Sequence, residues 1–223
     1  MKTVTQSTED YLKTVFDLSE SRGAREASTG DLAEALQVSA PAVSQMLRQM
    51  VKQSLVAHTP YKGVRLTAKG RRVALKTIRR HRLLECFLAE TLGYPLESLH
   101  DEAERLEHHI SDEFEQRIDS LLGNPERCPH GSPIPTPEGR IVQSQGRPLV
   151  EIEPPARLHV ERLRSNDPEL QRYLSESAVL PGAVIHFVNR EPFGGDLTVE
   201  IDRRTIRLSS QAARSVIVTP QID

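Results

Sequence analysis

The chain has 223 residues and a formal net charge of -2, from 29 Lys and Arg against 31 Asp and Glu. This length suits one or two domains with sizeable cores, or three small ones. The near-neutral charge excludes a uniformly basic coat for nucleic acid but allows a local basic surface. The 2 cysteines form no Cys-x-x-Cys pair, no apolar run approaches membrane-spanning length and no signal peptide opens the chain. We therefore expect a cytoplasmic protein with no membrane partner.

The first part of the chain predicts three short helices. The first begins at residues 7–10 with hydroxyl caps and early acids, and the second begins at residues 29–31. After a tight turn, Ser39 caps a third helix that carries Pro41 in its first turn, where a missing N–H costs nothing. A short helix, a tight turn and a capped helix are together typical of a helix-turn-helix.

Two alternating runs follow, residues 55–59 and 64–67, and they predict a β-hairpin of the kind that forms the wing of a winged helix. The outward side of the third helix offers short polar groups, amides and a methyl group, which suit base edges in a major groove, and nearby cations suit phosphates. A helix-turn-helix also occurs outside DNA binding, but the wing favours double-stranded DNA as the partner. The residues expected to contact DNA are Ser39, Pro41, Ala42, Ser44, Gln45, Arg48, Lys52, Lys62 and Arg65.

The middle of the chain concentrates histidines and carboxylates at helical spacing. Thr67 caps a long helix on which His81 and Glu85 are four residues apart, and a break at residues 92–95 leads to a second helix. On that helix His100, Glu104, Glu107 and His108 share one face. Imidazole and carboxylate groups from two helices are ligands for divalent cations. The spacing alone leaves a solvated acidic face as an equal alternative.

An apolar stripe accompanies these groups and predicts that the second helix runs continuously over residues 99–121. The stripe consists of Leu99, Ala103, Leu106, Ile110, Phe114, Ile118 and Leu121. Residues 124–155 are then rich in proline and glycine, which predicts an extended segment and a linker. Beyond them, alternating runs at 157–160, 184–188, 197–201, 205–208 and 215–218, with a short helix over 168–174, predict a small all-β domain, a barrel.

Over nearly its whole length the chain resembles the diphtheria toxin repressor family of metal-dependent regulators, of the manganese-responsive type. The likeness is carried by Ser7-Thr8-Glu9-Asp10-Tyr11-Leu12, Ala40-Pro41-Ala42-Val43-Ser44-Gln45, Leu66-Thr67-Ala68-Lys69-Gly70, His81-Arg82-Leu83-Leu84-Glu85, Leu99-His100-Asp101-Glu102-Ala103-Glu104, Glu107-His108 and Gly131-Ser132-Pro133-Ile134-Pro135. The resemblance implies a multidomain fold, mainly α with β. Its expected parts are a winged helix-turn-helix DNA-binding domain (1–73), a helical metal-binding and dimerisation domain (74–140), a linker (141–150) and an SH3-like, FeoA-like β-barrel (151–223).

The resemblance also implies two neighbouring metal sites. The regulatory site would use Asp10, Glu104, Glu107 and His108, and the second site His81, Glu85 and His100, with Asp167 or Glu169 of the β-domain as further candidates. Iron-responsive members place methionine and cysteine where this chain has Asp10 and Glu104. Because hard oxygen replaces soft sulfur, we expect Mn(II), with Fe(II) or another divalent transition metal as the alternative.

These expectations describe a manganese-activated homodimeric repressor of metal-uptake genes that binds a palindromic operator. A metal held by Asp10 and by the dimerisation domain would join the two domains and favour one arrangement. An enzyme is disfavoured, because the chain has no His-Glu-x-x-His and no Glu-x-x-His on two helices. A winged-helix regulator that senses a non-metal ligand is the alternative, and the β-domain could also bind peptides.

Overall fold

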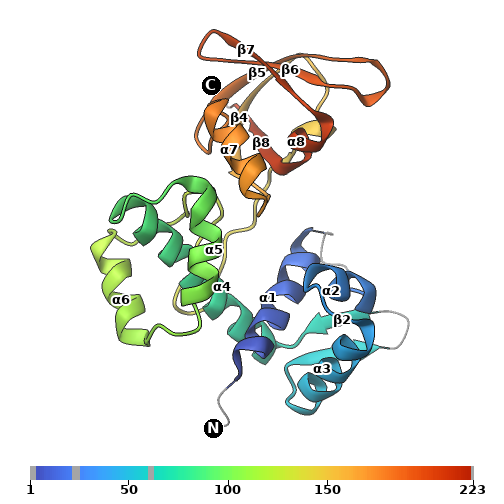
Figure 1. Cartoon of the computed structure of the whole chain (residues 1–223), viewed down its shortest axis with the longest axis vertical. Helices are drawn as coiled ribbons and strands as arrows, with labels where there is room; N and C mark the ends of the chain where they lie inside the picture. Colours follow the sequence, from blue (N-terminus) through green and yellow to red (C-terminus); the bar gives the residue numbers. More distant parts are fainter. Residues whose placement is uncertain (1–3, 22–25, 60–62, 222–223) are drawn as a thin grey trace. The chain divides into compact units, whose positions relative to one another are not determined.

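The computed structural model describes residues 4–21, 26–59 and 63–221 (Figure 1). The chain divides into two compact units, residues 1–80 with 135–140 and residues 81–134 with 141–223. Within the described ranges, none of the helices is both long and apolar enough to cross a membrane.

The first unit confirms the winged helix-turn-helix. Its elements are α1 (Gln6–Ser21), α2 (Thr29–Ala35), α3 (Ala40–Lys52), the antiparallel hairpin β1 (Val56–Thr59) and β2 (Gly63–Leu66), and the first part of α4 (Ala68–Glu90). The predicted caps are present: Ser39 Oγ accepts from Ala42 N at 3.4 Å and Thr67 Oγ1 accepts from Gly70 N at 3.1 Å. The second helix is capped by Ser28, one residue before the predicted start.

Gly70 allows α4 to start close against the hairpin. A Cβ at this position would lie 2.0 Å from the Leu55 carbonyl oxygen, so any side chain would push α4 away from that backbone. The same carbonyl accepts from Thr67 N at 3.0 Å. This close approach therefore fixes the position of the start of α4 against the winged-helix domain.

The helical part of the second unit contains residues 81–90 of α4, then α5 (Leu96–Leu106) and α6 (Asp112–Leu121). The prediction of one continuous helix over residues 99–121 is wrong. Ser111 breaks it, because its hydroxyl accepts from Phe114 N at 3.1 Å and starts α6 as an N-cap. The apolar stripe is divided accordingly: Leu99, Ala103 and Ile118 are buried, whereas Leu106, Phe114 and Leu121 are 36%, 40% and 66% exposed.

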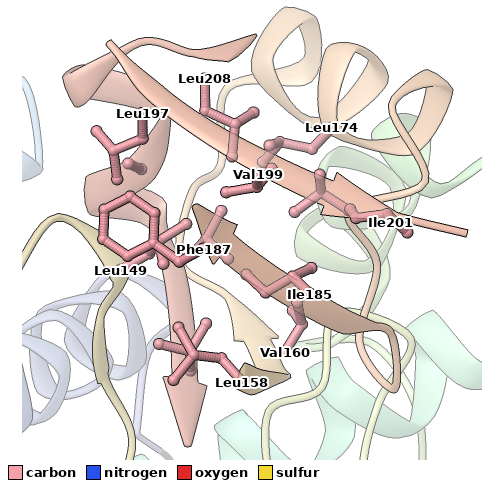
Figure 2. Packing of buried hydrophobic residues seen from close by; sticks show 14 of the residues in the cluster. Leu149, Leu158, Val160, Leu174, Ile185, Phe187, Leu197, Val199, Ile201 and Leu208 are labelled. Atoms are coloured by element: carbon pink, nitrogen blue, oxygen red, sulfur yellow. The ribbon is translucent and has the colours of Figure 1, made fainter. Parts of the chain in front are cut away.

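The β-domain confirms the five predicted strands and the short helix. A six-stranded antiparallel sheet has the order β3-β8-β4-β5-β6-β7. Its elements are β3 (Arg147–Pro148), β4 (Ala156–Leu163), α7 (Pro168–Glu176), β5 (Val184–Arg190), β6 (Leu197–Ile201), β7 (Arg204–Leu208), α8 (Ser210–Ser215) and β8 (Val216–Pro220), with short 3-10 turns at Leu149–Glu151 and Pro192–Gly194. Figure 2 shows Phe187, Leu197 and Val199 among the apolar side chains that fill its core.

The β-domain contacts the helical part of its own unit through α7. Arg172 Nε donates to Glu97 Oε1 of α5 at 3.1 Å, and Leu96 packs against the apolar core of the β-domain. Since α5 also carries His100 and Glu104, the helix that presents candidate metal ligands is in direct contact with the β-domain.

Candidate metal centre

His81 of α4 is the hub of a buried cluster of titratable groups. Its Nδ1 lies 2.5 Å from Glu107 Oε2 and 3.5 Å from Glu104 Oε2. Its Nε2 lies 3.2 Å from Glu85 Oε1 and 3.2 Å from His100 Nδ1. The ligand atoms of His81, His100 and Glu104 all lie within 4.8 Å of one another. Helical spacing explains this arrangement, because His81 and Glu85 share one face of α4 while His100 and Glu104 share one face of α5.

Glu107 and His108 lie just beyond the end of α5 rather than within it. Glu107 N still donates to Ala103 O at 2.9 Å, which places the Glu107 side chain one turn after Ala103. The Glu107 carboxylate is fully buried, and its Oε1 lies 3.4 Å from His108 Nε2. His109 points to the exposed side. Glu104, Glu107 and His108 are therefore brought together with His81.

A second group forms around Glu85. Glu85, Cys128 and His130 are all buried, and their ligand atoms lie within 4.8 Å of one another. His130 Nδ1 lies 3.1 Å from Glu85 Oε1, whereas its Nε2 is buried and has no hydrogen-bond partner among the described residues. Cys128 and His130 are not among the metal ligands predicted from the sequence. The available signal was a Cys-x-His pair inside the proline-rich segment.

The surroundings of Glu85 set the charge state of this group. Burial raises the pKa of the Glu85 carboxyl, but the charge of His81 and hydrogen bonds from His130 and His81 outweigh burial and hold the pKa well below its ordinary value. Burial, followed by the negative charge of Glu85, raises the pKa of the Cys128 thiol well above its ordinary value. A carboxylate is thus kept charged beside a neutral thiol.

The donor set fits a divalent cation. Buried carboxylates are costly unless they are paired, and the buried carboxylates of Glu85 and Glu107 each lie against histidine side chains. Oxygen and nitrogen donors at His81, His100, Glu104, Glu107 and His108 suit a hard or borderline metal, and the thiol gives the group at Glu85 a softer character.

The two ligands predicted in the β-domain lie elsewhere. Asp167 is the N-cap of α7, where its Oδ1 accepts from Glu169 N at 3.0 Å and Leu170 N at 3.4 Å. Glu169 is exposed in the first turn of that helix. Neither residue belongs to the groups described above. Asp10 lies half-buried on α1 of the first unit.

The predicted DNA-contacting residues gather on the outward side of α3 and on the wing. Val43, Leu47 and Met50 of α3 are buried and hold the helix against the domain core. The residues found exposed are Ser39, Pro41, Ala42, Gln45, Arg48, Lys52 and Arg65; Ser44 is half-buried, and Lys62 lies outside the described residues. Because the Ser39 hydroxyl caps α3, it also has a structural role.

Comparisons with known proteins cover nearly the whole chain. Residues 3–64 match the family model of the iron dependent repressor N-terminal DNA binding domain, residues 67–136 that of the iron dependent repressor metal binding and dimerisation domain, and residues 147–220 the FeoA domain. The iron-dependent repressor IdeR of Mycobacterium leprae is 31% identical, with 98% of this chain and 99% of that protein covered.

Solved structures agree in fold. A manganese-dependent transcriptional repressor in complex with manganese is 38% identical with a TM-score of 0.88, covering 96% of this chain and 100% of that one. The manganese-activated repressor ScaR in its apo form is 31% identical with a TM-score of 0.81, covering 95% and 100%.

Proposed function

The chain belongs to the iron-dependent repressor family of metal-activated, DNA-binding transcriptional repressors, and from this premise we propose that Mn(II) is its activating metal. Members of this family are DNA-binding regulators and not enzymes, which excludes a hydrolytic or di-iron reading of the histidines and carboxylates. One observation carries the proposal: His81, Glu104, Glu107 and His108 converge with oxygen and nitrogen donors only.

The donor chemistry favours Mn(II) at this first group. Carboxylate oxygens suit Mn(II), whereas thiolate and thioether ligands select softer ions. Relatives with manganese in their names and relatives with iron in theirs are both similar to this chain, so Fe(II) is the competing ion. A bound cation would supply positive charge that compensates the negative charge of the buried carboxylates.

We infer from the resemblance that Asp10 adds a further oxygen ligand from the DNA-binding domain. A ligand set drawn from two domains is complete only when those domains are suitably arranged, so it favours that arrangement over others. Metal and DNA must then strengthen each other's binding reciprocally. A shift from mostly inactive to mostly active would need about 10⁴-fold tighter metal binding to the active arrangement.

We propose a homodimer that binds a palindromic operator upstream of metal-uptake genes. The exposed apolar residues Leu106, Phe114 and Leu121 on the helical domain supply a surface for association. A two-fold dimer presents its two α3 helices to half-sites about 34–36 Å apart or a multiple of that distance. We expect Gln45 to pair with adenine and Arg48 to contact phosphate.

The test couples metal binding to DNA binding. Metal-free protein is titrated with Mn(II) by calorimetry, and its affinity for duplexes enriched from a random pool is measured by fluorescence anisotropy with Mn(II) and with chelator. The same measurements are made on the double variant Glu107→Ala/His108→Ala and on the control His109→Ala, which removes an exposed neighbouring imidazole.

We expect Mn(II) to tighten DNA binding by wild type and by His109→Ala, and to have no effect on the double variant. Equal DNA affinity of wild type with Mn(II) and with chelator would overturn metal activation. A larger effect of Fe(II) than of Mn(II) at equal occupancy would overturn the choice of metal alone.

A further inference from the structure

The turn that carries Cys128 and His130 is held by the β-domain as well as by α4. Within the turn, Cys128 N donates to Ser132 O at 3.0 Å and Gly131 N donates to Cys128 O at 2.7 Å. Leu163 N of β4 donates to His130 O at 2.8 Å. The segment that presents a thiol and an imidazole to Glu85 therefore lies directly on a strand of the β-domain.

Gly131 shows how close this approach is. Its φ is +82°, and a Cβ at this position would lie 2.2 Å from the Glu161 carbonyl oxygen of β4. A side chain here would both strain the backbone and separate the turn from the strand. The turn and the strand are therefore in direct contact through their backbones.

Arg127 adds the polar link between the turn and β4. Its Nη1 donates to Gly131 O at 2.7 Å, which closes the turn, and its Nη2 donates to Glu161 Oε1 at 3.2 Å. The Arg127 carbonyl oxygen also accepts from Cys86 Sγ of α4 at 3.7 Å. One residue therefore connects the ligand-bearing turn to α4 through its backbone and to β4 through its side chain.

A β-bulge places the Glu161 side chain at this junction. The pairing of β4 with β8 shifts register between Val160 and Arg162, and such a bulge redirects the side chain of the extra residue. Glu161 Oε2 accepts from Ser144 Oγ at 2.7 Å and from Gly146 N at 3.1 Å, and the side chain is only 9% exposed. Hydrogen bonds to a charged carboxylate are directional and stronger than those between neutral groups, while the partner Arg127 is 45% exposed.

We propose that Glu161 is a positioning residue for metal binding by Glu85, Cys128 and His130, acting through Arg127 on the turn that carries two of the three ligands. The proposal includes the premise that this group of three, whose ligand atoms lie within 4.8 Å of one another, holds a divalent cation. It adds that the β-domain influences the metal affinity of the group through Glu161 and Arg127. Residues that orient metal ligands in this way alter affinity by about 10- to 100-fold.

The experiment uses Co(II) as the probe, because a bond between cobalt and the Cys128 thiolate gives a near-ultraviolet absorption band that other ligands of the group do not give. The full chain is titrated as wild type, Glu161→Ala, Glu161→Gln, Arg127→Ala and the double variant of Glu161→Ala with Arg127→Ala. Ser144→Ala is the matched control, because it removes a different hydrogen bond to the same carboxylate. Cys128→Ser shows which band belongs to Cys128.

We expect Glu161→Ala and Arg127→Ala each to lower the Co(II) affinity, measured from the Cys128 absorption band, by about 10- to 100-fold. The double variant should add little, because both residues act through one link. Glu161→Gln keeps an oxygen for Ser144 and Gly146 but loses the charge that faces Arg127, so we expect an intermediate loss. Ser144→Ala should titrate like wild type, and thermal unfolding in chelator separates a loss of affinity from a loss of folding.

Two results would overturn the proposal, and they differ in what else they affect. If Glu161→Gln and Arg127→Ala both bound Co(II) with wild-type affinity, Glu161 would have no positioning role, although the three residues could still bind metal. These two variants also decide the question if Glu161→Ala fails to fold. A band that Cys128→Ser does not change would overturn the metal group and this proposal together. Neither result bears on metal activation through Glu107 and His108, which the DNA-binding test decides separately.

Discussion

The β-domain and the helical domain beside it bury different kinds of side chain. The largest buried residues of the β-domain are apolar, among them Phe187, Leu149 and Leu174. The helical domain has a smaller apolar cluster, and next to it are the buried groups His81, Glu85, Glu107 and His130. Apolar burial stabilises by itself, whereas buried charges stabilise only with suitable partners. We infer that the β-domain is stable without metal and that the helical domain gains stability when a cation joins its buried carboxylates.

The largest effect is expected in the β-domain core. Phe187→Ala removes a ring that is 1% exposed and should lower the free energy of unfolding by about 3–5 kcal/mol, measured by urea denaturation in chelator. Phe193→Ala is the control, because that ring lies fully in solvent and its loss should change stability by less than about 0.5 kcal/mol. Equal losses for the two variants would contradict the assignment of the core.

The next effect tests the buried polar cluster. His81→Ala removes one of the imidazoles that contact the buried carboxylates of Glu85 and Glu107, and we expect the free energy of unfolding to fall by about 3 kcal/mol in chelator. His109→Ala, at an exposed position two residues beyond Glu107, should have little effect. If His81→Ala unfolded at the wild-type urea concentration, the expectation that His81 stabilises the two buried carboxylates would be wrong.

Metal addition should distinguish the two domains directly. At a Mn(II) concentration of 100 times the dissociation constant, binding stabilises by about 2.7 kcal/mol, so the fraction of molecules in which the metal-binding elements are open should fall by about 100-fold. Amide hydrogen exchange should show this protection in α4 and α5 and a smaller change in β5 and β6. Equal protection of both sets of amides would mean that the two domains open as one unit.

The smallest effect concerns the contact between α5 and α7. Backbone hydrogen bonding and then Arg172 lower the pKa of the Glu97 carboxyl, so this pair contributes stability above the ordinary carboxyl pKa of about 4.3 and loses it as the pH falls through the lowered value. Because Arg172 is 57% exposed, we expect less than about 1 kcal/mol between pH 7 and pH 3.

Glu97→Gln should remove this part of the pH dependence of the unfolding free energy, whereas Glu176→Gln, at an exposed position on α7, should keep it. A wild-type pH dependence in Glu97→Gln would show that other carboxylates dominate in this range.

Local sequence signals predicted most elements of the fold. Ser39 and Thr67 marked helix starts because their hydroxyls satisfy backbone N–H groups within the next turn, and alternating runs marked the strands of the β-domain. No helix was predicted at α8 (Ser210–Ser215), and the single helix predicted over residues 99–121 was wrong because the apolar period was extended through Ser111. The signal was readable there, since Ser111 is followed by Asp112 and Glu113, a cap with acids in the first turn.

The sequence by itself determined the ligand types and their grouping on each helix. His81 lies four residues from Glu85, and His100 lies four residues from Glu104. Family resemblance joined these pairs into sites. Only the tertiary structure decided that Cys128 and His130 lie against Glu85, and that Glu161 reaches Arg127 across 34 residues. The proline-rich segment has no periodicity from which its contacts could be derived, and its position is set by hydrogen bonds to α4 and β4. Spacing along one helix is local geometry, whereas the meeting of a turn with a strand depends on the packing of the whole unit.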